Sequence, residues 1–393
     1  MMVMPLGPDF ARSLGIPNSH LGFIGGSYTA AASISGLVGA LFLDRFDRRK
    51  ALAVAMFGLV CGTAAGGFAT GLASLSAARV VAGAFGGPAT SLSLSIIADG
   101  IPPERRGRAL GAVAGAFSIA SVLGVPAGLE LARVGGWRLP FFAVAALGLL
   151  VATAALLAMP PMRAHLDRPR SSVPQASPLE IVRRREVQAS LASTAIVMVT
   201  AFAIIPNLSA YLQYNLGYPR EHLGLLYLVG GAVSFVTMRL VGSFVDRYGS
   251  APVAAAGTVL FIGVLTTGFL GEHTPVPVML LFVAFMISGS MRNVPVNTQA
   301  TKVPQADERA RFMSTQSAVQ HFAAASGAFL GAQMLTERPD HALAGMPSVA
   351  LMSAVIALPL PLLLAMVAAR LKRRDELWPV PTPELVRGSD GGG

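Results

Sequence analysis

The sequence is poor in cysteine and in charged residues. Cys61 is the only cysteine among 393 residues, which excludes an internal disulfide and a cysteine-rich metal site. Cys61 lies in the middle of an apolar run, where we expect a small core residue. Charged residues make up 13% of the chain and hydrophobic residues 53%. So little polar surface cannot cover the two or three soluble domains that this length would otherwise predict.

Several catalytic motifs are also missing. The chain holds no G-x-x-x-x-G-K-[ST] phosphate loop, which excludes a P-loop ATP-driven pump. It has no H-E-x-x-H and no C-x-x-C, and no Ser, His and Asp in an order typical of a hydrolase. We therefore predict a protein that is not an enzyme and that uses no cofactor and no metal.

The cationic residues do not indicate a nucleic-acid partner, although the net charge is +10. A nucleic-acid-binding protein gathers Lys and Arg on one folded face. Here they fall in short segments between long apolar runs, as in the loops of a membrane protein. The predicted surroundings are a lipid bilayer.

Apolar windows long enough to cross a bilayer recur along the whole chain. A bilayer core of about 30 Å needs about 20 apolar helical residues. Such windows lie at 20–43, 51–71, 75–98, 109–132, 138–160, 190–213, 222–245, 251–271, 275–298, 312–335 and 347–370. Since only helices satisfy their own backbone groups in serial spans, the sequence predicts an all-α polytopic membrane protein.

The distribution of Lys and Arg predicts the orientation of these spans. One set of alternate loops, with the C-terminal tail, holds 22 of the 30 cationic residues. By the positive-inside rule this set is cytoplasmic; it comprises 44–50, 99–108, 161–188, 246–250, 302–311 and the tail from 370.

This orientation makes residues 9–19 an outer loop. Residues 1–6 would be the outer end of a first helix, and six residues rise only about 9 Å. We expect that helix to be largely missing, which leaves about eleven full spans.

The two halves of the chain repeat each other at an offset of 202 residues. His20-Leu21-Gly22 recurs at 222–224, the LDRF of 43–46 recurs as VDRY at 245–248, and the Ile-Pro of 101–102 recurs as Val-Pro at 303–304. Each copy follows after six spans, so the repeat is parallel about an axis along the membrane normal. The predicted domains are a bundle over 1–160, a cytoplasmic linker over 161–188, a second bundle over 189–371 and a cytoplasmic tail over 372–393.

The repeated loop carries a resemblance to a known family. Residues 40–49 read ALFLDRFDRR and residues 242–249 read GSFVDRYG. Together they resemble the G-x-x-x-D-R-x-G-R-[RK] loop of the major facilitator superfamily. The first copy lacks both glycines and the second lacks the trailing arginines. The resemblance covers essentially the whole chain and implies two pseudo-symmetric six-helix bundles. It also implies a cytoplasmic gate formed by Asp44, Arg45, Arg48, Arg49, Asp246 and Arg247; an ordinary charged loop is the alternative.

Two further segments resemble motifs of that family. Arg79, four residues before Gly83, is similar to its fourth-helix arginine, which implies a role in the substrate or proton pathway; snorkelling to the interface is the alternative. Gly124, Pro126 and Gly128 loosely match its fifth-helix antiporter motif. Small residues there predict close helix packing.

Polar residues inside spans are candidates for the transport pathway, because they are costly in lipid. Arg292 lies in mid-span with no acidic residue in the same span. Arg239 lies closer to a helix end, and we interpret it as structural. Gln316 and Gln320 share one helix face. His321 can carry protons near neutral pH, although a neutral, hydrogen-bonded histidine is the commoner case. The predicted pathway set is Arg79, Arg292, Asn293, Asn297, Asn207, Gln316, Gln320 and His321.

The spans lack a buried carboxylate, which proton-coupled relatives usually have. Glu130 is the only acidic residue within a span, and it lies near the outer end. We predict an alternating-access exporter of a small organic solute in a bacterial inner membrane, with protons as the coupling ion implied by the resemblance. We expect a monomer. The alternatives are an uncoupled facilitator and a transport-inactive membrane scaffold or truncated product.

Overall fold

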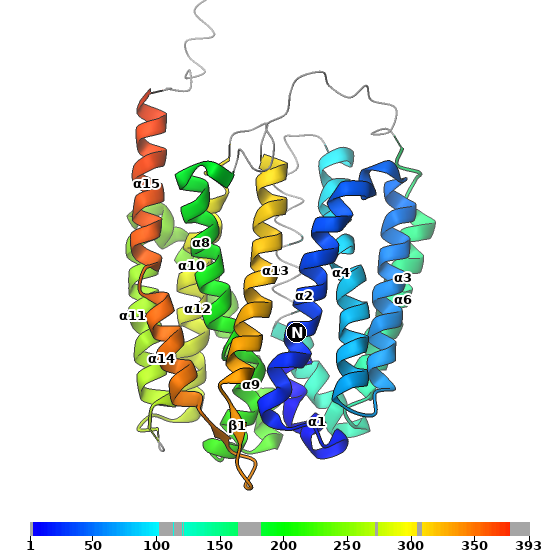
Figure 1. Ribbon diagram of the computed structural model, residues 1–393, viewed down its shortest axis with the longest axis vertical. Coiled ribbons are helices and arrows are strands. Elements are labelled where there is room, and N and C mark those ends of the chain that lie inside the picture. The colour runs from blue at the N-terminus through cyan, green and yellow to red at the C-terminus, as the bar shows by residue number, and fades with distance from the viewer. Residues whose placement is uncertain are drawn as a thin grey trace, which may run out of the picture.

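The computed structural model describes residues 3–101, 122–163, 182–271, 274–304 and 309–377, together with 113 and 120. These residues are helical except for connecting turns and one hairpin of two short strands. The long helices run roughly side by side, and the connections between them lie at the two ends of the bundle (Figure 1). This is the architecture of a multi-pass α-helical membrane protein, as predicted.

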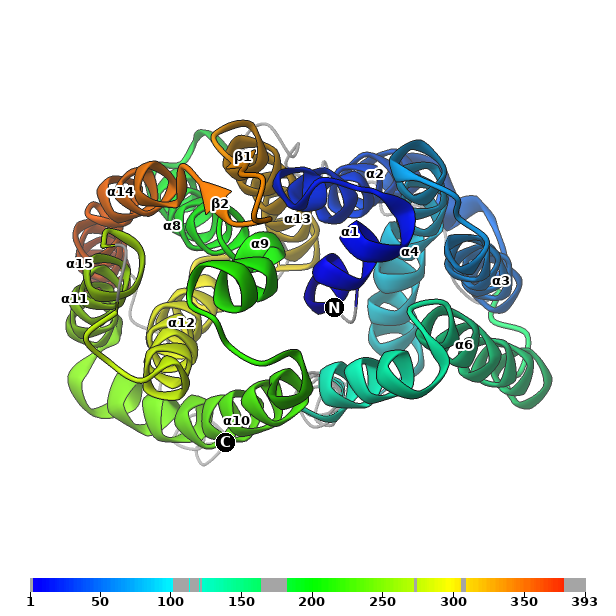
Figure 2. The same ribbon diagram turned by 90° about the horizontal axis from the view of Figure 1, so that it is seen from below.

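The first half of the chain forms one group of helices, on the right in Figure 2. They are α1 (Gly7–Leu14), α2 (Leu21–Phe42), α3 (Arg48–Gly67), α4 (Leu72–Gly100), a helical segment over 122–135 and α6 (Leu139–Ala158). Single 3-10 turns precede α1 and α2 and follow α2, at Met4–Leu6, Asn18–His20 and Leu43–Arg45.

The second half forms the other group. Its helices are α8 (Arg185–Phe202), α9 (Ile205–Ala210), α10 (Leu223–Tyr248), α11 (Ser250–Phe269), α12 (Val278–Ala300), α13 (Arg309–Gln333), α14 (Met346–Ala357) and α15 (Leu360–Leu377). A π-helical turn at Tyr211–Asn215 follows α9, and a 3-10 turn at Arg220–His222 precedes α10. Strands β1 (Thr336–Glu337) and β2 (Leu343–Ala344) pair antiparallel between α13 and α14.

The internal repeat has the same backbone geometry in both halves. Pro17 and Pro219 each begin a 3-10 turn in an extended conformation, with ψ of 138° and 134°. His20 and His222 end those turns with φ of −90°. The helix pairs α2/α10 and α3/α11 then begin at the same offset of 202 residues. The repeat read from the sequence is therefore a repeat of structure.

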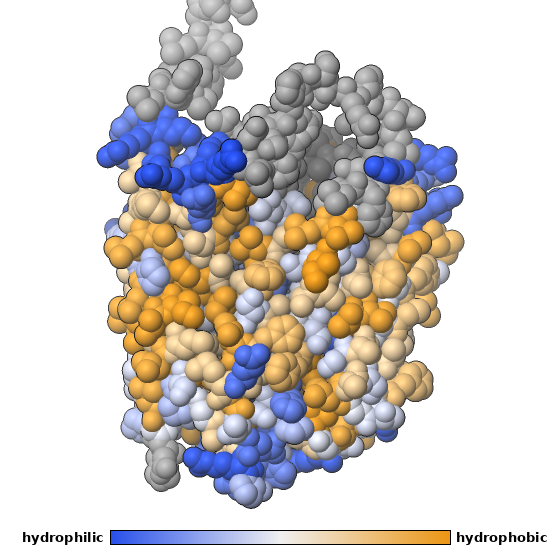
Figure 3. Space-filling view, in the orientation of Figure 1, coloured by the Kyte–Doolittle hydropathy of each residue, from blue (hydrophilic) through white to orange (hydrophobic). Residues whose placement is uncertain are grey.

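The two ends of the molecule differ in the elements and charges that they carry. The hairpin end holds α1, β1 and β2; the cation-rich end holds the start of α3 and the end of α15 (Figure 1). A broad hydrophobic belt separates hydrophilic surfaces at these two ends (Figure 3). Nine of the helical segments in the described part of the chain are long and apolar enough to cross a membrane.

Two local expectations from the sequence were wrong, and two predicted spans contain a break that was not expected. Residues 7–14 are helical, so Asp9 lies on α1 and not in a loop. The windows 190–213 and 347–370 do lie in candidate spans, at Arg185–Asn215 and Met346–Arg374, but each span contains a break. One breaks between α8 and α9, where Pro206 follows the break, and the other breaks before Leu360, where Pro359 cannot continue the helix. Cys61 is exposed on α3 instead of buried, because the side of a helix that faces lipid also selects small apolar residues.

Candidate functional site: the closure between the two halves

An ion pair joins the two halves at the hairpin end. Arg220, in the turn before α10, donates from Nη2 to Oδ2 of Asp9 on α1 at 2.7 Å and from Nε to Oδ1 at 3.2 Å. Both side chains are about one-fifth exposed, at 19% and 20%. The two-point geometry fixes how the first helix of one half lies against the second half.

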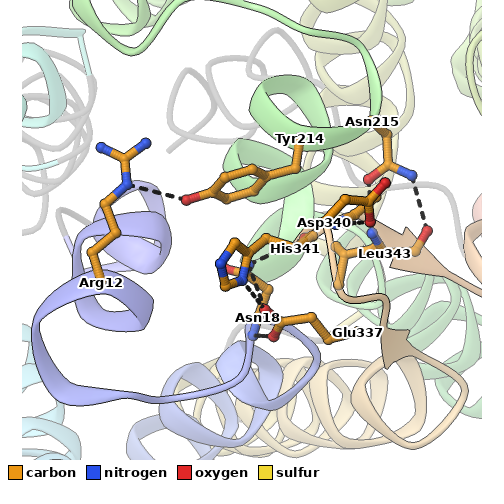
Figure 4. Close-up of polar contacts among 9 residues, drawn as sticks. Arg12, Asn18, Tyr214, Asn215, Glu337, Asp340, His341 and Leu343 are labelled. Atoms are coloured by element: carbon orange, nitrogen blue, oxygen red, sulfur yellow. Dashed lines mark hydrogen bonds and ion pairs between the residues drawn. The ribbon is translucent and has the colours of Figure 1, made fainter.

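Asn18 is the centre of a second connection between the halves, drawn in Figure 4. Its side chain is fully buried at the start of the turn before α2. The Asn18 backbone N–H donates to the carboxylate of Glu337 on β1, and Asn18 Nδ2 donates to the His341 carbonyl oxygen at 3.3 Å. The Glu337 carboxylate also contacts His341 Nδ1 at 2.5 Å. One buried residue of the first half therefore binds both the first strand of the hairpin and the turn that connects its two strands.

The hairpin is held in place by its own half. Asn215 donates from Nδ2 to the Leu343 carbonyl oxygen and accepts the Leu343 N–H, both at 2.9 Å. His341 adopts a left-handed conformation with φ of 64°, which a non-glycine residue keeps only where its surroundings hold it. Arg12 of α1 donates to the Tyr214 hydroxyl at 3.3 Å (Figure 4). The tip of the hairpin is thus a fixed surface for the first half to contact.

Below these polar contacts, α2 and α13 pack closely across the halves. An ideal Cβ at Gly22 would lie 2.3 Å from the Ala328 carbonyl oxygen, so only glycine fits there. Deeper in the bundle, Ser33 Oγ donates to the Ala318 carbonyl oxygen at 3.1 Å. Gly231 of α10 makes a similar close approach to Val122 on the other side of the molecule. Small residues allow both contacts, as is usual between membrane helices.

The break between α8 and α9 places a buried amide beside the first half. Asn207 of α9 is fully buried, and neither of its amide atoms has a hydrogen-bond partner within the described part of the chain. Next to it, Pro206 lines a small pocket with Met4, Ile24 and Gly25. The predicted pathway residue Asn207 therefore lies where α9 packs against α1 and α2.

Arg292 lies inside the second half and not at the junction between the halves. Its side chain is 1% exposed. Nη2 donates to Thr200 Oγ1 of α8 at 2.7 Å, and the guanidinium lies over the Phe261 ring of α11 at 4.0 Å. Arg292 Nε has no partner in the region that the structure covers. Burying a cation with so few partners is costly, which is the usual reason to suspect a functional role.

The other predicted pathway residues of the second half lie on α12 and α13. Asn297 Nδ2 donates to Asn293 Oδ1 at 2.7 Å along one face of α12. Gln316 is buried, with Nε2 at 3.5 Å from Thr194 Oγ1 of α8. Gln320 and His321 are half-buried in the middle of α13. Arg292 and Gln316 thus both contact threonines of α8, and no hydrogen bond among the described residues joins them to each other.

In the first half, Arg79 lies in the first turns of α4. Its guanidinium lies over the ring of Tyr28 from α2 at 4.4 Å, and its buried Nε has no hydrogen-bond partner among the residues described. Tyr28 is also close to Gly83 and Gly86 of α4. Arg79 therefore takes part in the packing of α2 on α4, and its side chain points inward and not toward the interface.

The loop predicted to form a gate also ties helices together within one half. Asp47 accepts the Arg49 N–H at 3.0 Å, which caps α3, and the Met162 N–H at 3.2 Å. Arg49 Nε donates to the Leu156 carbonyl oxygen of α6 at 2.8 Å. Arg45 is exposed, whereas Arg48 is buried and has a partner. The Asp44 side chain lies outside the described residues.

The hydrogen bonds of Asp47 affect its ionisation. Burial alone would raise the pKa of this carboxyl, but it also accepts hydrogen bonds from the Met162 N–H, the Arg163 guanidinium and the Arg49 N–H. These outweigh burial, so the pKa of Asp47 lies below its ordinary value of 3.8.

The equivalent loop in the second half is more open. Asp246 and Arg247 are exposed in the last turn of α10, and the Arg247 guanidinium lies 5.3 Å from the Tyr248 ring centroid. Arg239 stacks on Phe235 at 4.4 Å, one turn away on the same helix. In the loose fifth-helix motif, Gly124 is exposed, and a Cβ added there would meet none of the described residues within 4 Å; Pro126 is half-buried and Gly128 is buried.

Sequence reasoning missed the contacts at the hairpin end. Asp9, Asn18 and Glu337 are ordinary polar residues of helix ends and turns, and no motif marks them. Their partners lie more than 200 residues away. Only the repeat offset, which brings the starts of α2 and α10 to the same end, could have suggested that these turns meet.

Helices in two repeated halves that close on each other at one end define a membrane transporter. The family model of the Major Facilitator Superfamily matches residues 1–328 and again 190–388. The chain therefore belongs to the major facilitator superfamily, and it is a transporter and not an enzyme.

Comparison with individual proteins agrees with this assignment. The chain is 26% identical over 302 residues to a chloramphenicol resistance protein of Streptomyces lividans, covering 77% of this chain and 76% of that one. It is 25% identical to a chloramphenicol efflux pump of Mycobacterium tuberculosis, over 74% and 70% of the two chains.

Solved structures share the fold. A D-xylose-proton symporter matches with a TM-score of 0.69 and 19% identity over 91% of each chain. A bacterial homolog of the human lysosomal transporter Spinster, in an inward-facing and occupied conformation, matches with a TM-score of 0.67 and 18% identity. That match covers 97% of this chain and 94% of the other.

Proposed function

We propose that this transporter is a proton-coupled exporter of a small organic solute that works by alternating access. The observation that carries the proposal is the closure at the hairpin end. Asp9–Arg220, Arg12–Tyr214 and the contacts of Asn18 all join side chains or turns of opposite halves. Such contacts can break and re-form without unfolding a helix, as a gate that opens in each cycle must do.

The proposed orientation places the hairpin end outside the cell and the cation-rich end in the cytoplasm of a bacterium, with the protein in the inner membrane. The positive-inside distribution of Lys and Arg supports this, and the relatives come from bacteria. The proposed units are the bundles over 1–160 and 189–371, the linker over 161–188 and the tail over 372–393. Because one chain supplies both sides of the closure, we propose that the monomer is sufficient for transport.

Chloramphenicol is the first substrate to test. Two relatives are named for chloramphenicol resistance and chloramphenicol efflux. The candidate pathway offers neutral amides, at Asn207, Asn293 and Gln316, and an aromatic hydroxyl at Tyr28. These groups suit a neutral solute with amide and hydroxyl groups and an aromatic ring.

Proton coupling is supported by the resemblance of Arg79 to the fourth-helix arginine and by His321 in the middle of α13. One observation favours the uncoupled alternative: no span has a carboxylate at its middle. A facilitator would carry solute only down its own gradient.

Flux measurements in proteoliposomes test the proposal. Purified protein is reconstituted with radiolabelled chloramphenicol outside, and an inward or outward pH gradient is imposed. We expect accumulation that reverses with the sign of the gradient and stops when a protonophore removes it. Equilibration of chloramphenicol that ignores the pH gradient would show an uncoupled facilitator. No flux above protein-free vesicles would exclude chloramphenicol as the substrate.

A further inference from the structure

A cationic hollow lies at the cation-rich end, between the start of α3 and the end of α6. Its volume is about 310 Å³, and it is lined by Asp47, Arg49, Lys50, Leu156, Pro161 and Arg163. These residues come from the first bundle and the start of the linker, so the hollow is separate from the closure between the halves. Arg49 also belongs to the predicted gate motif, but the proposed transport cycle assigns no role to the hollow itself.

The walls of the hollow are fixed by hydrogen bonds. Arg49 donates to the Leu156 carbonyl oxygen, and the Arg48 N–H donates to the Met162 carbonyl oxygen at 3.3 Å. Asp47 accepts from the Met162 N–H and, through Oδ2, from Arg163 Nε at 3.1 Å. These bonds connect the first turn of α3 to the chain that leaves α6. The site is therefore a preformed part of the fold and not a chance meeting of surface side chains.

The hollow presents positive charge to its surroundings. Three cations line it with one carboxylate, and the Asp47 side chain is only 6% exposed, with both oxygens already accepting hydrogen bonds. The Arg163 side chain is 61% exposed, and Lys50 is exposed. Cationic groups thus face outward, whereas Asp47, the one carboxylate among the described lining residues, faces the protein. An anion is the complementary ligand.

The position of the hollow identifies the kind of anion. It lies where α3 begins and α6 ends, which is the border of the hydrophobic belt (Figure 3). On α6, Leu157 is 75% exposed and Leu150 is 68% exposed. On α3, Val54 is 64% exposed. A ligand bound here would have its charged group among cations and its remaining length along apolar helix faces.

We propose that this hollow binds the phosphodiester headgroup of an anionic phospholipid, with its acyl chains lying along α3 and α6. Lys50 and Arg163 bind the phosphate oxygens, and Arg49 completes the cationic wall while it holds α6. Basic pockets between membrane helices are known to select anionic lipids. Bound lipid would brace the connection between α3 and α6.

Lipid retention measured by native mass spectrometry tests the proposal. Full-length protein is released from nanodiscs that contain equal amounts of phosphatidylglycerol and phosphatidylcholine. We expect the intact protein to retain phosphatidylglycerol preferentially. Lys50→Gln, which leaves every bond of the walls in place, should weaken that retention roughly five-fold, and Lys50→Gln with Arg163→Gln should weaken it further.

The matched control removes two cations from the same end of the other half. Lys372→Gln with Arg373→Gln changes exposed residues of α15 and should leave phosphatidylglycerol retention unchanged. An equal loss of phosphatidylglycerol in the control would mean that general surface charge causes the retention, which would overturn the proposal. Unchanged retention in the Lys50 and Arg163 variants would also overturn it. Displacement of the lipid by millimolar inorganic phosphate would also overturn it, because the site would then select a free anion.

Discussion

Arg220 and Asp9 bind each other through two parallel contacts, although they lie 211 residues apart and in opposite halves of the chain. This ion pair can exist only while the hairpin end is closed. In the proposed alternating-access cycle it therefore stabilises the state that is closed at this end, and it does not contribute to the folding of either half alone.

We predict that Asp9→Asn shifts the protein toward a state that is open at the hairpin end. A partly exposed ion pair contributes about 0.5–1 kcal/mol, so the ratio of closed to open molecules should fall roughly two- to five-fold. Spin labels at Val134→Cys and Arg338→Cys, in a Cys61→Ser background, report the distance between the halves at that end.

Two further variants make this measurement specific. Exchange of the charges, Asp9→Arg with Arg220→Asp, should restore much of the closed population. Lys372→Gln breaks an exposed pair with Glu376 inside one helix at the opposite end of the molecule and should change nothing. A closed population that Asp9→Asn leaves intact would mean that the pair does not contribute to the gate.

Gly22 sets how closely α2 approaches α13. We predict that Gly22→Ala prevents closure at the hairpin end and abolishes transport, because the new Cβ would lie 2.3 Å from a backbone oxygen and 2.8 Å from the Ala332 Cβ. The same spin-label distance should lengthen, and chloramphenicol flux should fall to background.

The internal repeat supplies the matched control for this change. Gly224 lies at the equivalent position of α10, and an added Cβ there would have no neighbour within 4 Å among the described residues. Both substitutions raise helix propensity by the same amount, so only the contact with Ala328 differs. Normal transport in Gly22→Ala, or equal loss in Gly224→Ala, would contradict this account.

Sequence patterns predicted the fold well because the membrane imposes a simple rule. Each span must satisfy its own backbone, so long apolar windows are helices and their loops follow the charge distribution. The repeat then predicted that α2 and α10, and α3 and α11, begin at equivalent residues. The sequence did not predict the breaks before Ile205 and Leu360. The apolar windows continue through Pro206 and Pro359, and hydropathy alone does not show where a helix is interrupted.

The candidate site could be predicted only in part. Arg292 was found because a charge in a span is rare, yet its neighbours Thr200 and Phe261 come from other helices and have no signal of their own. From the sequence, Asp47 was interpreted only as a residue that replaces a glycine of the family motif. In the structure it is the cap of α3 and an anchor for residues 162 and 163, a role that depends on the position of α6.

Arg292→Met should separate a structural role from a role in transport. Methionine fills a similar volume without a charge, and such replacements of buried ions are often neutral or stabilising. We therefore predict a melting temperature at least as high as that of the parent protein, with loss of pH-driven chloramphenicol flux. A variant with both normal stability and normal flux would place Arg292 outside the transport pathway.

The Asp47 carboxylate should make the stability of the first half depend on pH. Its pKa is lower in the folded protein than its ordinary value of 3.8, so ionised Asp47 stabilises the folded state at every pH above 3.8. That contribution is lost as the pH falls below 3.8 and through the lowered pKa. At pH 7, Asp47→Asn should cost about 1 kcal/mol, the usual value of a lost hydrogen bond. The difference in stability between Asp47→Asn and the parent protein should narrow as the pH approaches 3.

Thermal melts of both proteins in detergent between pH 7 and pH 3 measure this narrowing. Asp246→Asn is the control, because Asp246 is the acidic residue of the equivalent loop and is exposed at the end of α10. It should melt like the parent protein at every pH. A difference in melting temperature between the parent protein and Asp47→Asn that stays constant down to pH 3 would contradict this prediction. The side chain would then act through its shape and hydrogen bonds, and its charge would not stabilise the connection between α3 and α6.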